Sequence, residues 1–538
     1  MSTSPESPRG PDVIPLSDAF APYKWAATVE EVAARHGLAP AEVLKFDQNT
    51  PPFPGVAQIP LAESFATLDQ YPSGLYRNLR EAAAGYVNAG SGTDVGWEQV
   101  VIGAGADDLI MLCARTYLGP GRCAAMFPQT YSFYRTVTLL SGADPVVETE
   151  GASLIWRCNP ENPTGEVTPV SELVALARAN PAAAVIVDEA YIEFGGESVV
   201  PWLDECPNLI VLRTMSKAFG YAGLRVGYAV AAPATAAVLE ARRAPAPIAS
   251  PAARIAAAAL RDPRYDIASE IEERERVRSD LVAAGFDAPP AAGNFVWIRS
   301  DADLGADLEA RGVIVRSFPN GIRVTLRRPS ENNVFLQALG IEPGLPPGRE
   351  ATVIRTSTET ALRITLSLDR SGRSHVRTGI GFLDHLLTLL AFHAGFDLAC
   401  VAGGDLDVDE HHTVEDVLAA FGDALQQALG TREGVTRYGS AVVPMDEARA
   451  TAAVDLVRRP HSEISLAFTG DRVGGLAVSL LPHALERFTM QAGCTVHVDS
   501  AGADDHHIAE AAFKALGQAL RQAVAPGDGG IRSTKGIA

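Results

Sequence analysis

Short apolar runs and alanine-rich stretches alternate along the first 340 residues. Residues 183–188 read AAVIVD and residues 208–212 read NLIVL, and each run has the length of a buried strand. Residues 171–180 are rich in alanine, which favours helix. Because strands that alternate with helices form parallel sheets with functional residues at the strand ends, this part is predicted to have an α/β fold.

The pattern changes near the C-terminus, where two long amphipathic helices are predicted. After His412, apolar side chains recur at helical spacing as far as Leu425, and Gly430 follows as a stop signal. In the stretch EAAFKALGQALRQAV after His507, apolar side chains recur at the same helical spacing. The last part of the chain is therefore predicted to differ in architecture from the first.

Proline and glycine separate the two parts. The segment GIEPGLPPGRE covers residues 340–350, and ten of the eleven histidines lie beyond it. A stretch of this composition is typical of a short, semi-stiff linker. The predicted organisation is a disordered N-terminus at 1–11, a first domain at 12–340, a linker at 341–350 and a second domain at 351–538.

Composition narrows the function classes. The chain is 47% hydrophobic and 20% charged, as in globular enzymes, and its net charge of -20 excludes a general nucleic-acid or acidic-membrane surface. The six scattered cysteines are interpreted as buried thiols. Since no apolar run approaches the ~20 residues of a membrane helix and the start is unlike a signal peptide, a cytoplasmic location is expected.

A lysine in a glycine-rich segment is the first candidate for chemistry. Lys217 lies in SKAFGYAGLRVGY, just after the apolar run at 208–212, and the motifs NPENPTG (159–165) and VDEAY (187–191) precede it. Together these motifs resemble the fold-type I pyridoxal-phosphate aminotransferases over about residues 12–340. Within that group the chain looks most like the histidinol-phosphate aminotransferases.

The resemblance implies a role for each motif residue. Lys217 would form a Schiff base with pyridoxal 5'-phosphate and then move the proton. Asp188 would pair with the pyridinium nitrogen, so that the ring accepts electrons. Asn162 and Tyr191 would hold the phenolic oxygen, and Tyr131 would stack on the ring.

Further residues would bind the anions. A glycine-rich turn at 103–108, GAGADD, opens a helix whose free N–H groups favour a phosphate. The implied phosphate site consists of Ala104, Gly105, Ala106, Asp107, Ser216 and Arg225. Tyr71 would reach the cofactor of a neighbouring subunit, which implies a dimer. Arg323 would bind the substrate carboxylate, and Arg316 and Tyr23 are candidates for a substrate phosphate.

Two segments depart from the family pattern and leave the substrate open. Residues 46–52 read FDQNTPP, and residues 324–332 lack the glycine usual after that strand. A pyridoxal-phosphate-dependent decarboxylase of amino-acid phosphates uses much the same residues. The alternatives for this part are therefore such a decarboxylase or an aminotransferase of another substrate.

The sequence H-H-x-x-E occurs twice in the second part. DEHHTVEDVLAAFG covers residues 409–422 and DDHHIAEAAFKALG covers residues 504–517. Since the glutamate follows the histidines by three and four residues, it shares a helical face with them. His411 and His506 are 95 residues apart, and the single histidines His385 and His483 are 98 apart. This spacing predicts two similar halves, about 351–440 and 441–538, and a metal site.

The second part closely resembles imidazoleglycerol-phosphate dehydratase. The motifs that carry this resemblance are RTSTET (355–360), TGIGFLDHLL (378–387), both H-H-x-x-E clusters, RYG (437–439), PMDEA (444–448) and STKG (533–536). It implies a duplicated α+β domain and di-metal sites with two Mn²⁺ ions per site, although the ligand types alone do not choose among Mn, Fe, Zn and Ni. The implied ligands are His385, His411, His412, Glu415, His483, His506, His507 and Glu510.

The remaining dehydratase residues follow from the same resemblance. Ions on the imidazole nitrogens would hold the substrate ring as imidazolate while hydroxide leaves. Glu359 and His393 are candidates for the proton transfers, with the choice of base open. The substrate phosphate would be bound by Arg437, Arg459, Ser533, Thr534 and Lys535.

The two resemblances imply consecutive reactions of histidine biosynthesis. The dehydratase product is the ketone that a histidinol-phosphate aminotransferase aminates with glutamate, releasing 2-oxoglutarate. The dehydratase resemblance also implies large homo-oligomers, commonly of 24 subunits. For the second part, a di-metal hydrolase or a metal-binding assembly module remains the alternative.

Overall fold

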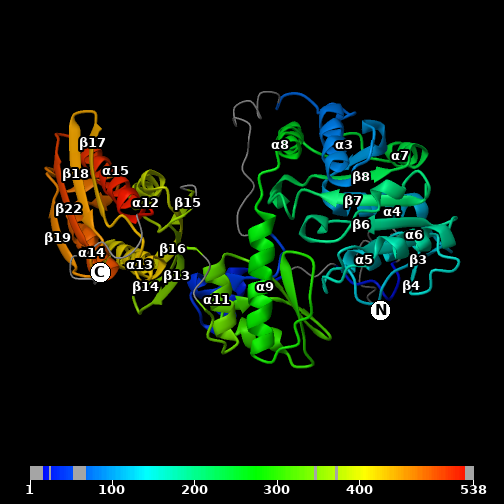
Figure 1. Ribbon diagram of the computed structural model, residues 1–538, viewed down its shortest axis with the longest axis horizontal. Coiled ribbons are helices and arrows are strands. Elements are labelled where there is room, and N and C mark those ends of the chain that lie inside the picture. Colours follow the sequence, from blue (N-terminus) through cyan, green and yellow to red (C-terminus); the bar gives the residue numbers. More distant parts are fainter. Residues whose placement is uncertain (1–15, 23–25, 52–67, 345–347, 370–372, 528–538) are drawn as a thin grey trace, which may run out of the picture. The chain divides into compact units, whose positions relative to one another are not determined.

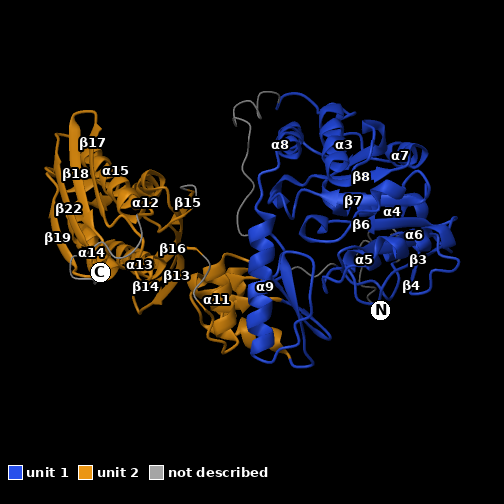
Figure 2. Cartoon of the chain, in the orientation of Figure 1, with its two compact units in different colours: residues 1–26, 47–302, 316–326 blue, residues 27–46, 303–315, 327–538 orange. Residues whose placement is uncertain are grey.

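The computed structural model describes residues 16–22, 26–51, 68–344, 348–369 and 373–527. They form two compact units, one of residues 1–26, 47–302 and 316–326 and the other of residues 27–46, 303–315 and 327–538 (Figure 2). The predicted disordered N-terminus, Tyr23, Ser533, Thr534 and Lys535 lie outside the described residues. Among the described helices, none is both long and apolar enough to cross a bilayer.

A seven-stranded sheet organises the first unit, in the order β2-β8-β7-β6-β5-β3-β4 (Figure 1). Its strands are β2 (Val100–Gly103), β3 (Cys123–Ala125), β4 (Asp144–Val146), β5 (Leu154–Cys158), β6 (Ala184–Asp188), β7 (Leu209–Thr214) and β8 (Gly227–Ala231). The pairs from β4 to β7 are parallel, and β8 is antiparallel to both of its neighbours. The predicted α/β architecture is confirmed, and the two apolar runs form β6 and β7.

Helices cover the sheet because both of its faces are apolar. In β6, Val185 and Val187 belong to one buried cluster, and Ile186 belongs to another. Alternate side chains thus leave a strand on opposite faces, and a continuous apolar run marks a strand buried on both sides. The helices of this unit are α3 (Arg77–Ser91), α4 (Gly105–Tyr117), α5 (Ser132–Leu140), α6 (Val170–Ala179), α7 (Pro233–Glu240), α8 (Ser250–Arg261) and α9 (Ile267–Ala283).

A small antiparallel sheet completes the first unit, in the order β11-β12-β9. Its strands are β9 (Phe295–Arg299), β11 (Arg316–Phe318) and β12 (Gly321–Thr325). Arg316 on β11 is paired in register with Arg323 on β12. The two predicted anion-binding arginines therefore lie side by side on neighbouring strands.

The second unit contains a small group of elements and a large duplicated domain. The small group consists of α1 (Val29–His36), β1 (Leu44–Lys45), α10 (Leu304–Glu309), β10 (Val313–Ile314) and α11 (Pro329–Ala338), with β1 parallel to β10. The duplicated domain begins at β13 (Glu350–Thr356), where the buried Glu350 carboxylate accepts a 2.8 Å hydrogen bond from Ser330 Oγ of α11.

The duplicated domain repeats one arrangement of strands and helices. Its first half contains β13, β14 (Thr360–Ser367), β15 (Ser374–Arg377), α12 (Gly381–Ala394), β16 (Asp397–Gly404) and α13 (His411–Leu429). Its second half contains β17 (Tyr438–Met445), β18 (Ala448–Asp455), β19 (His461–Ser465), α14 (Leu480–Ala492), β22 (Thr495–Ala501) and α15 (Asp505–Val524), with a short ribbon of β20 (Arg472–Val473) and β21 (Leu476–Ala477). The sheets have the equivalent orders β13-β14-β16-β15 and β17-β18-β22-β19. The predicted internal duplication is confirmed.

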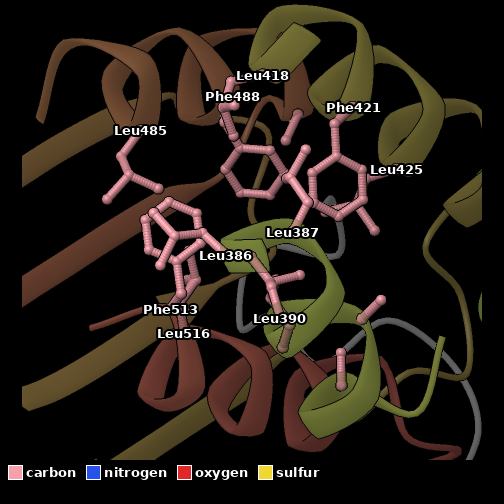
Figure 3. Packing of buried hydrophobic residues seen from close by; sticks show 14 of the residues in the cluster. Leu386, Leu387, Leu390, Leu418, Phe421, Leu425, Leu485, Phe488, Phe513 and Leu516 are labelled. Carbon is pink, nitrogen blue, oxygen red and sulfur yellow. The ribbon is translucent and has the colours of Figure 1, made fainter. Parts of the chain in front are cut away.

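Helices from the two halves pack against each other, α13 with α14 and α12 with α15. Leucine and phenylalanine side chains of all four helices fill the space between them (Figure 3). A glycine lies at each helix crossing, Gly422 in α13 and Gly517 in α15. A Cβ atom at Gly422 would lie 2.4 Å from the carbonyl oxygen of Phe488, and one at Gly517 would lie 2.7 Å from that of Leu390. Both crossings therefore require glycine.

Replacing Gly422 with alanine is expected to destabilise the duplicated domain by about 1–3 kcal/mol, because the backbones of α13 and α14 must separate to admit the methyl group. The matched control is Gly381→Ala, where no atom lies within 4 Å of the new Cβ. Urea unfolding followed by circular dichroism measures the difference. Equal unfolding midpoints for the two variants would contradict this account of the helix crossing.

Candidate active sites

A cavity of about 490 Å³ lies in the first unit, at the carboxyl ends of the central strands. Asp188 is the last residue of β6, and Lys217 follows the end of β7 by three residues. Both line the cavity because adjacent parallel strands end at the same edge of the sheet. The predicted residues Ala106, Asp107, Tyr131, Asn162, Tyr191, Ser216, Arg225, Arg316 and Arg323 line the same cavity.

Burial shifts the pKa values of the acid and the amine in opposite directions, and both shifts favour the uncharged form. Burial raises the pKa of Asp188 to about 6, although hydrogen bonds from the Tyr134 hydroxyl and the Ala190 amide oppose the rise. Burial lowers the pKa of Lys217 from 10.5 to about 8, and the nearby Arg323 adds to this effect. The cavity thus combines an amine with a lowered pKa and a carboxyl group with a raised pKa.

Two contacts fix the position of the lysine. Lys217 Nζ donates to the carbonyl oxygen of Gln48 at 3.3 Å and lies 5.6 Å from the centre of the Tyr191 ring. The Tyr191 hydroxyl accepts a 2.9 Å hydrogen bond from Asn49 Nδ2. The lysine therefore lies against the segment at 46–52, which departs from the family pattern.

The hydrogen bonds of two buried residues, Asn49 and Tyr134, were not predicted from the sequence. Asn49 exchanges hydrogen bonds with Thr325, its backbone N–H donating at 2.9 Å and its Oδ1 accepting at 2.8 Å. The Tyr134 hydroxyl donates to Asp188 Oδ2 at 2.7 Å. Their hydrogen-bond partners come from distant parts of the chain. Asn49 itself lies in FDQNTPP (46–52), which departs from the aminotransferase pattern.

Two hydrogen bonds hold Arg323, the arginine predicted to bind the substrate carboxylate. Arg323 is buried, with Nη1 donating to Asn162 Oδ1 at 2.5 Å and Nη2 donating to the Asp47 carbonyl oxygen at 2.7 Å. These contacts orient the guanidinium toward the cavity that it lines. Arg316 lines the same cavity from the neighbouring strand.

The other end of the cavity lies at the start of α4. Ala104 precedes the first helical residue, Gly105, whose φ is +80° and whose missing Cβ leaves room for the guanidinium of Arg225. Arg225 Nη2 forms a 3.1 Å ion pair with Asp107 Oδ2, and Asp107 Oδ1 accepts a 3.0 Å hydrogen bond from the Tyr131 hydroxyl. Helix amides and an arginine thus meet, as an anion site requires.

Two further predicted cofactor residues have contrasting positions. The Ser216 hydroxyl is buried and accepts a hydrogen bond from the Thr214 hydroxyl at 3.1 Å. Tyr71 is 95% exposed and does not line the cavity of its own chain. Of the described residues predicted to bind the cofactor, all but Ala104, Gly105 and Tyr71 line the cavity, and Ala104 and Gly105 directly precede Ala106 at the start of α4.

In the second unit, six of the eight predicted metal ligands form two groups of three. One group is His385, His506 and Glu510, and the other is His411, Glu415 and His483. Within each group the candidate ligand atoms all lie within 4.8 Å of one another. Each group combines side chains from both halves of the duplicated domain.

Each group has the geometry of two imidazoles around one carboxylate oxygen. Glu510 Oε1 lies 2.7 Å from His385 Nε2 and 3.1 Å from His506 Nε2. Although burial opposes the change, the hydrogen bonds from His385 and Lys514 lower the pKa of Glu510 to about 2. The carboxylate is therefore ionised, as a metal ligand must be.

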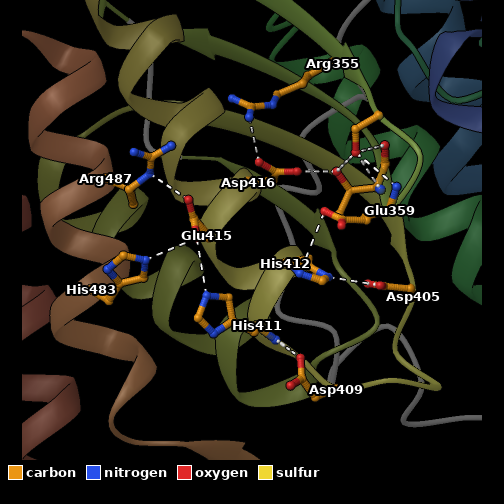
Figure 4. A network of polar contacts seen from close by, with 12 residues as sticks. Arg355, Glu359, Asp405, Asp409, His411, His412, Glu415, Asp416, His483 and Arg487 are labelled. Atoms are coloured by element: carbon orange, nitrogen blue, oxygen red, sulfur yellow. Dashed lines mark hydrogen bonds and ion pairs between the residues drawn. The ribbon is translucent and has the colours of Figure 1, made fainter.

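The other two histidines face away from these groups. His412 Nδ1 lies 3.0 Å from Asp405 Oδ2 (Figure 4), and this contact raises the pKa of His412. His507 Nδ1 lies 2.8 Å from Glu447 Oε2, which raises the pKa of His507 in the same way. His412 and His507 thus share a second arrangement, in which an acidic side chain holds the Nδ1 side and leaves Nε2 for another partner.

The proposed proton-transfer residues lie apart. Glu359 is exposed, with Oε2 at 3.8 Å from Nε2 of His412. His393 is eight residues after His385 on α12, which corresponds to about 12 Å along the helix axis. The geometry therefore associates Glu359, rather than His393, with one of the imidazoles.

The two described phosphate-binding candidates differ in their surroundings. Arg437 forms a bidentate pair with Asp455, with distances of 2.7 Å from Nε and 3.0 Å from Nη2. Arg459 is exposed at the surface of the second half. Arg437 is thus oriented by a carboxylate, whereas the Arg459 side chain is directed toward solvent.

Comparison with known proteins identifies both parts. Residues 41–339 match the family model of aminotransferases of class I and II, and residues 378–520 match that of imidazoleglycerol-phosphate dehydratase. The dehydratase of Granulibacter bethesdensis is 48% identical over 193 residues, which are 35% of this chain and 98% of that protein. The dehydratase of Phytophthora nicotianae is 49% identical over 191 residues, but the match spans only 42% of its length.

A solved structure supports the fold of the first part. Histidinol-phosphate aminotransferase from Sinorhizobium meliloti, in complex with pyridoxal-5'-phosphate, has a TM-score of 0.52 at 23% identity, covering 60% of this chain and 97% of that chain. This likeness confirms the predicted fold-type I architecture. The chain belongs, through its first part, to the class I and II aminotransferases and, through its last part, to the imidazoleglycerol-phosphate dehydratases.

Proposed function

We propose that the chain catalyses two consecutive reactions of histidine biosynthesis. Residues 351–538 dehydrate imidazole glycerol phosphate to imidazole acetol phosphate, and residues 12–340 transaminate this ketone with glutamate to histidinol phosphate. The observation that carries the proposal is the presence, in one chain, of a dehydratase domain and of an aminotransferase domain whose fold is similar to that of a histidinol-phosphate aminotransferase. Residues 341–350 join the two.

The two groups of imidazoles and carboxylates fit divalent manganese. Two neutral nitrogens and one ionised oxygen within 4.8 Å of one another form a donor set of borderline hardness. Bound ions would hold the substrate ring as imidazolate and stabilise the charge that develops as hydroxide leaves. In this chain, Glu359 would exchange a proton with the substrate near the departing hydroxyl, beside His412.

His412 and His507 remain in the proposed ligand set. Asp405 and Glu447 hold their Nδ1 atoms, as a carboxylate often does for a metal-bound histidine, so that an ion would bind at Nε2. In this structure Glu359 Oε2 lies 3.8 Å from Nε2 of His412, and Asp446 Oδ2 lies 3.7 Å from Nε2 of His507. Because both rings face away from the groups of their own chain, we propose that they complete groups on neighbouring copies. A homo-oligomer of dehydratase domains, such as a 24-mer, would then be necessary for activity.

The aminotransferase cavity fits pyridoxal phosphate. The cofactor would supply the electron sink for proton removal from the amino acid, with its phosphate at the start of α4 and Arg225. Asp188 would hold the proton on the pyridine nitrogen, and Lys217 would bind the cofactor and move a proton. Arg323 and Arg316 would bind the anionic substrate.

Two single substitutions are expected to separate the activities. Lys217→Ala abolishes transamination of imidazole acetol phosphate and leaves dehydration unchanged, because this amine lines the cavity of the first unit and the metal groups lie in the second unit. His483→Ala abolishes dehydration and leaves transamination unchanged, because it removes one of three ligands from a metal group. Product analysis for each step, with its own substrate supplied, measures both. If Lys217→Ala kept transamination, the assignment of the lysine would be wrong.

Removal of divalent ions is expected to abolish dehydration without affecting transamination. A chelator takes the ions from the two groups in the second unit, whereas the aminotransferase residues need none. Adding Mn²⁺ back restores the rate of dehydration, and adding Mg²⁺ serves as the control because Mg²⁺ prefers oxygen ligands. Undiminished dehydration after exhaustive chelation would contradict the metal proposal.

The capture of pyridoxal phosphate is expected to depend on pH. Since the neutral amine is the nucleophile, the capture rate should rise as the pH approaches the lowered pKa of Lys217, about 8, and then level off. Trapping with borohydride at a series of pH values, followed by mass spectrometry, measures this rate. A rate that continues to rise up to pH 10 would show that the amine has its ordinary pKa.

A further inference from the structure

The Glu510 carboxylate divides its two oxygens between imidazoles and a cation. Oε1 lies beside His385 and His506, and Oε2 accepts a 2.7 Å hydrogen bond from Lys514 Nζ. Lys514 is four residues after Glu510, one turn along α15. The ammonium therefore occupies the oxygen that does not face the imidazoles.

The Glu415 carboxylate is divided in the same way. Oε2 lies 3.1 Å from His483 Nε2 and 3.4 Å from His411 Nε2. Oε1 forms a 2.8 Å ion pair with Arg487 Nε (Figure 4). Thus each carboxylate presents one oxygen to two imidazoles and the other to a cation.

The two cations come from different helices. The position that corresponds to Lys514 in the first half, four residues after Glu415, is Ala419, which is fully buried. The position that corresponds to Arg487, four residues after His385, is Leu389. In one group the cation follows the glutamate, and in the other it follows the single histidine.

The position of the cation has a physical consequence for the ligand. An ion pair on one carboxylate oxygen restricts rotation of the side chain and leaves the other oxygen for an ion. Neither pair is fully exposed: the side-chain exposures are 24% for Glu415 and 36% for Arg487, against 8% for Glu510 and 15% for Lys514. Side chains that orient a metal ligand in this way typically raise the metal affinity by about 10–100-fold.

We propose that Arg487 is a positioning residue for the His411, Glu415 and His483 group and performs the role that Lys514 performs for the other group. It holds Glu415 so that Oε2 faces the two imidazoles and binds a divalent ion through that oxygen. This inference rests on the proposed manganese centres. What the two groups share is a cation on the outer carboxylate oxygen, although the cation stands at a different place in the sequence in each group.

The first test is the affinity of the full-length protein for Mn²⁺, measured by calorimetry and by the electron paramagnetic resonance signal of the free ion. Arg487→Leu is expected to weaken one of the two ions per chain by about 10–100-fold and to leave the other unchanged. Arg487→Lys should recover part of the loss. The control Arg521→Leu removes the same charge from the exposed end of α15 and should change neither affinity.

The second test moves the cation within the other group. Lys514→Ala is expected to weaken its ion by a similar factor, and adding Leu389→Arg is expected to restore the affinity to within a few-fold, because the new arginine takes the place on α12 that Arg487 has on α14. Leu389→Arg alone should change little. The unaltered group in each variant reports that the domain has folded.

Three results would overturn the inference. Unchanged or tighter binding in Arg487→Leu would show that the arginine does not position Glu415. Failure of Leu389→Arg to restore binding would show that the cation has no equivalent place in the two halves. Binding of fewer than two ions by the unaltered protein would instead refute the proposed manganese centres, and this inference with them.

Discussion

Each candidate metal group depends on a close crossing between a helix of one half and a helix of the other. Gly422 and Gly517 allow α13 to approach α14 and α15 to approach α12. Only at this separation do His411 and Glu415 meet His483, and do His506 and Glu510 meet His385. Neither half contains a complete group of ligands. Duplication supplies two sets of ligand residues, but a group forms only where helices of the two halves pack against each other.

The first unit shows the same dependence of chemistry on burial. Asp188 and Lys217 lie at the ends of adjacent parallel strands because both faces of the sheet are apolar and covered by helices. The same burial raises the pKa of the acid and lowers that of the amine. The shifted pKa values of these two groups thus follow from where the strands end, before any substrate contact.

Local sequence patterns predicted the elements better than the direction of individual side chains. Apolar runs correctly predicted β6 and β7, and the H-H-x-x-E clusters correctly predicted the beginnings of α13 and α15. However, adjacent residues on a helix point about 100° apart, so His411 and His412 face different partners, a difference that the motif does not reveal. Asn49 and Tyr134 were missed because Thr325 and Asp188, which hold them, are distant in sequence.

The central claim is that one chain carries out both steps in succession. The most direct measurement supplies the purified full-length protein with imidazole glycerol phosphate, Mn²⁺, pyridoxal phosphate and glutamate, and follows imidazole acetol phosphate and histidinol phosphate over time. The account predicts transient ketone and then histidinol phosphate, formed only when both cofactors are present. Accumulation of the ketone without histidinol phosphate would contradict the proposed aminotransferase substrate, and absence of both the ketone and histidinol phosphate would contradict the dehydratase.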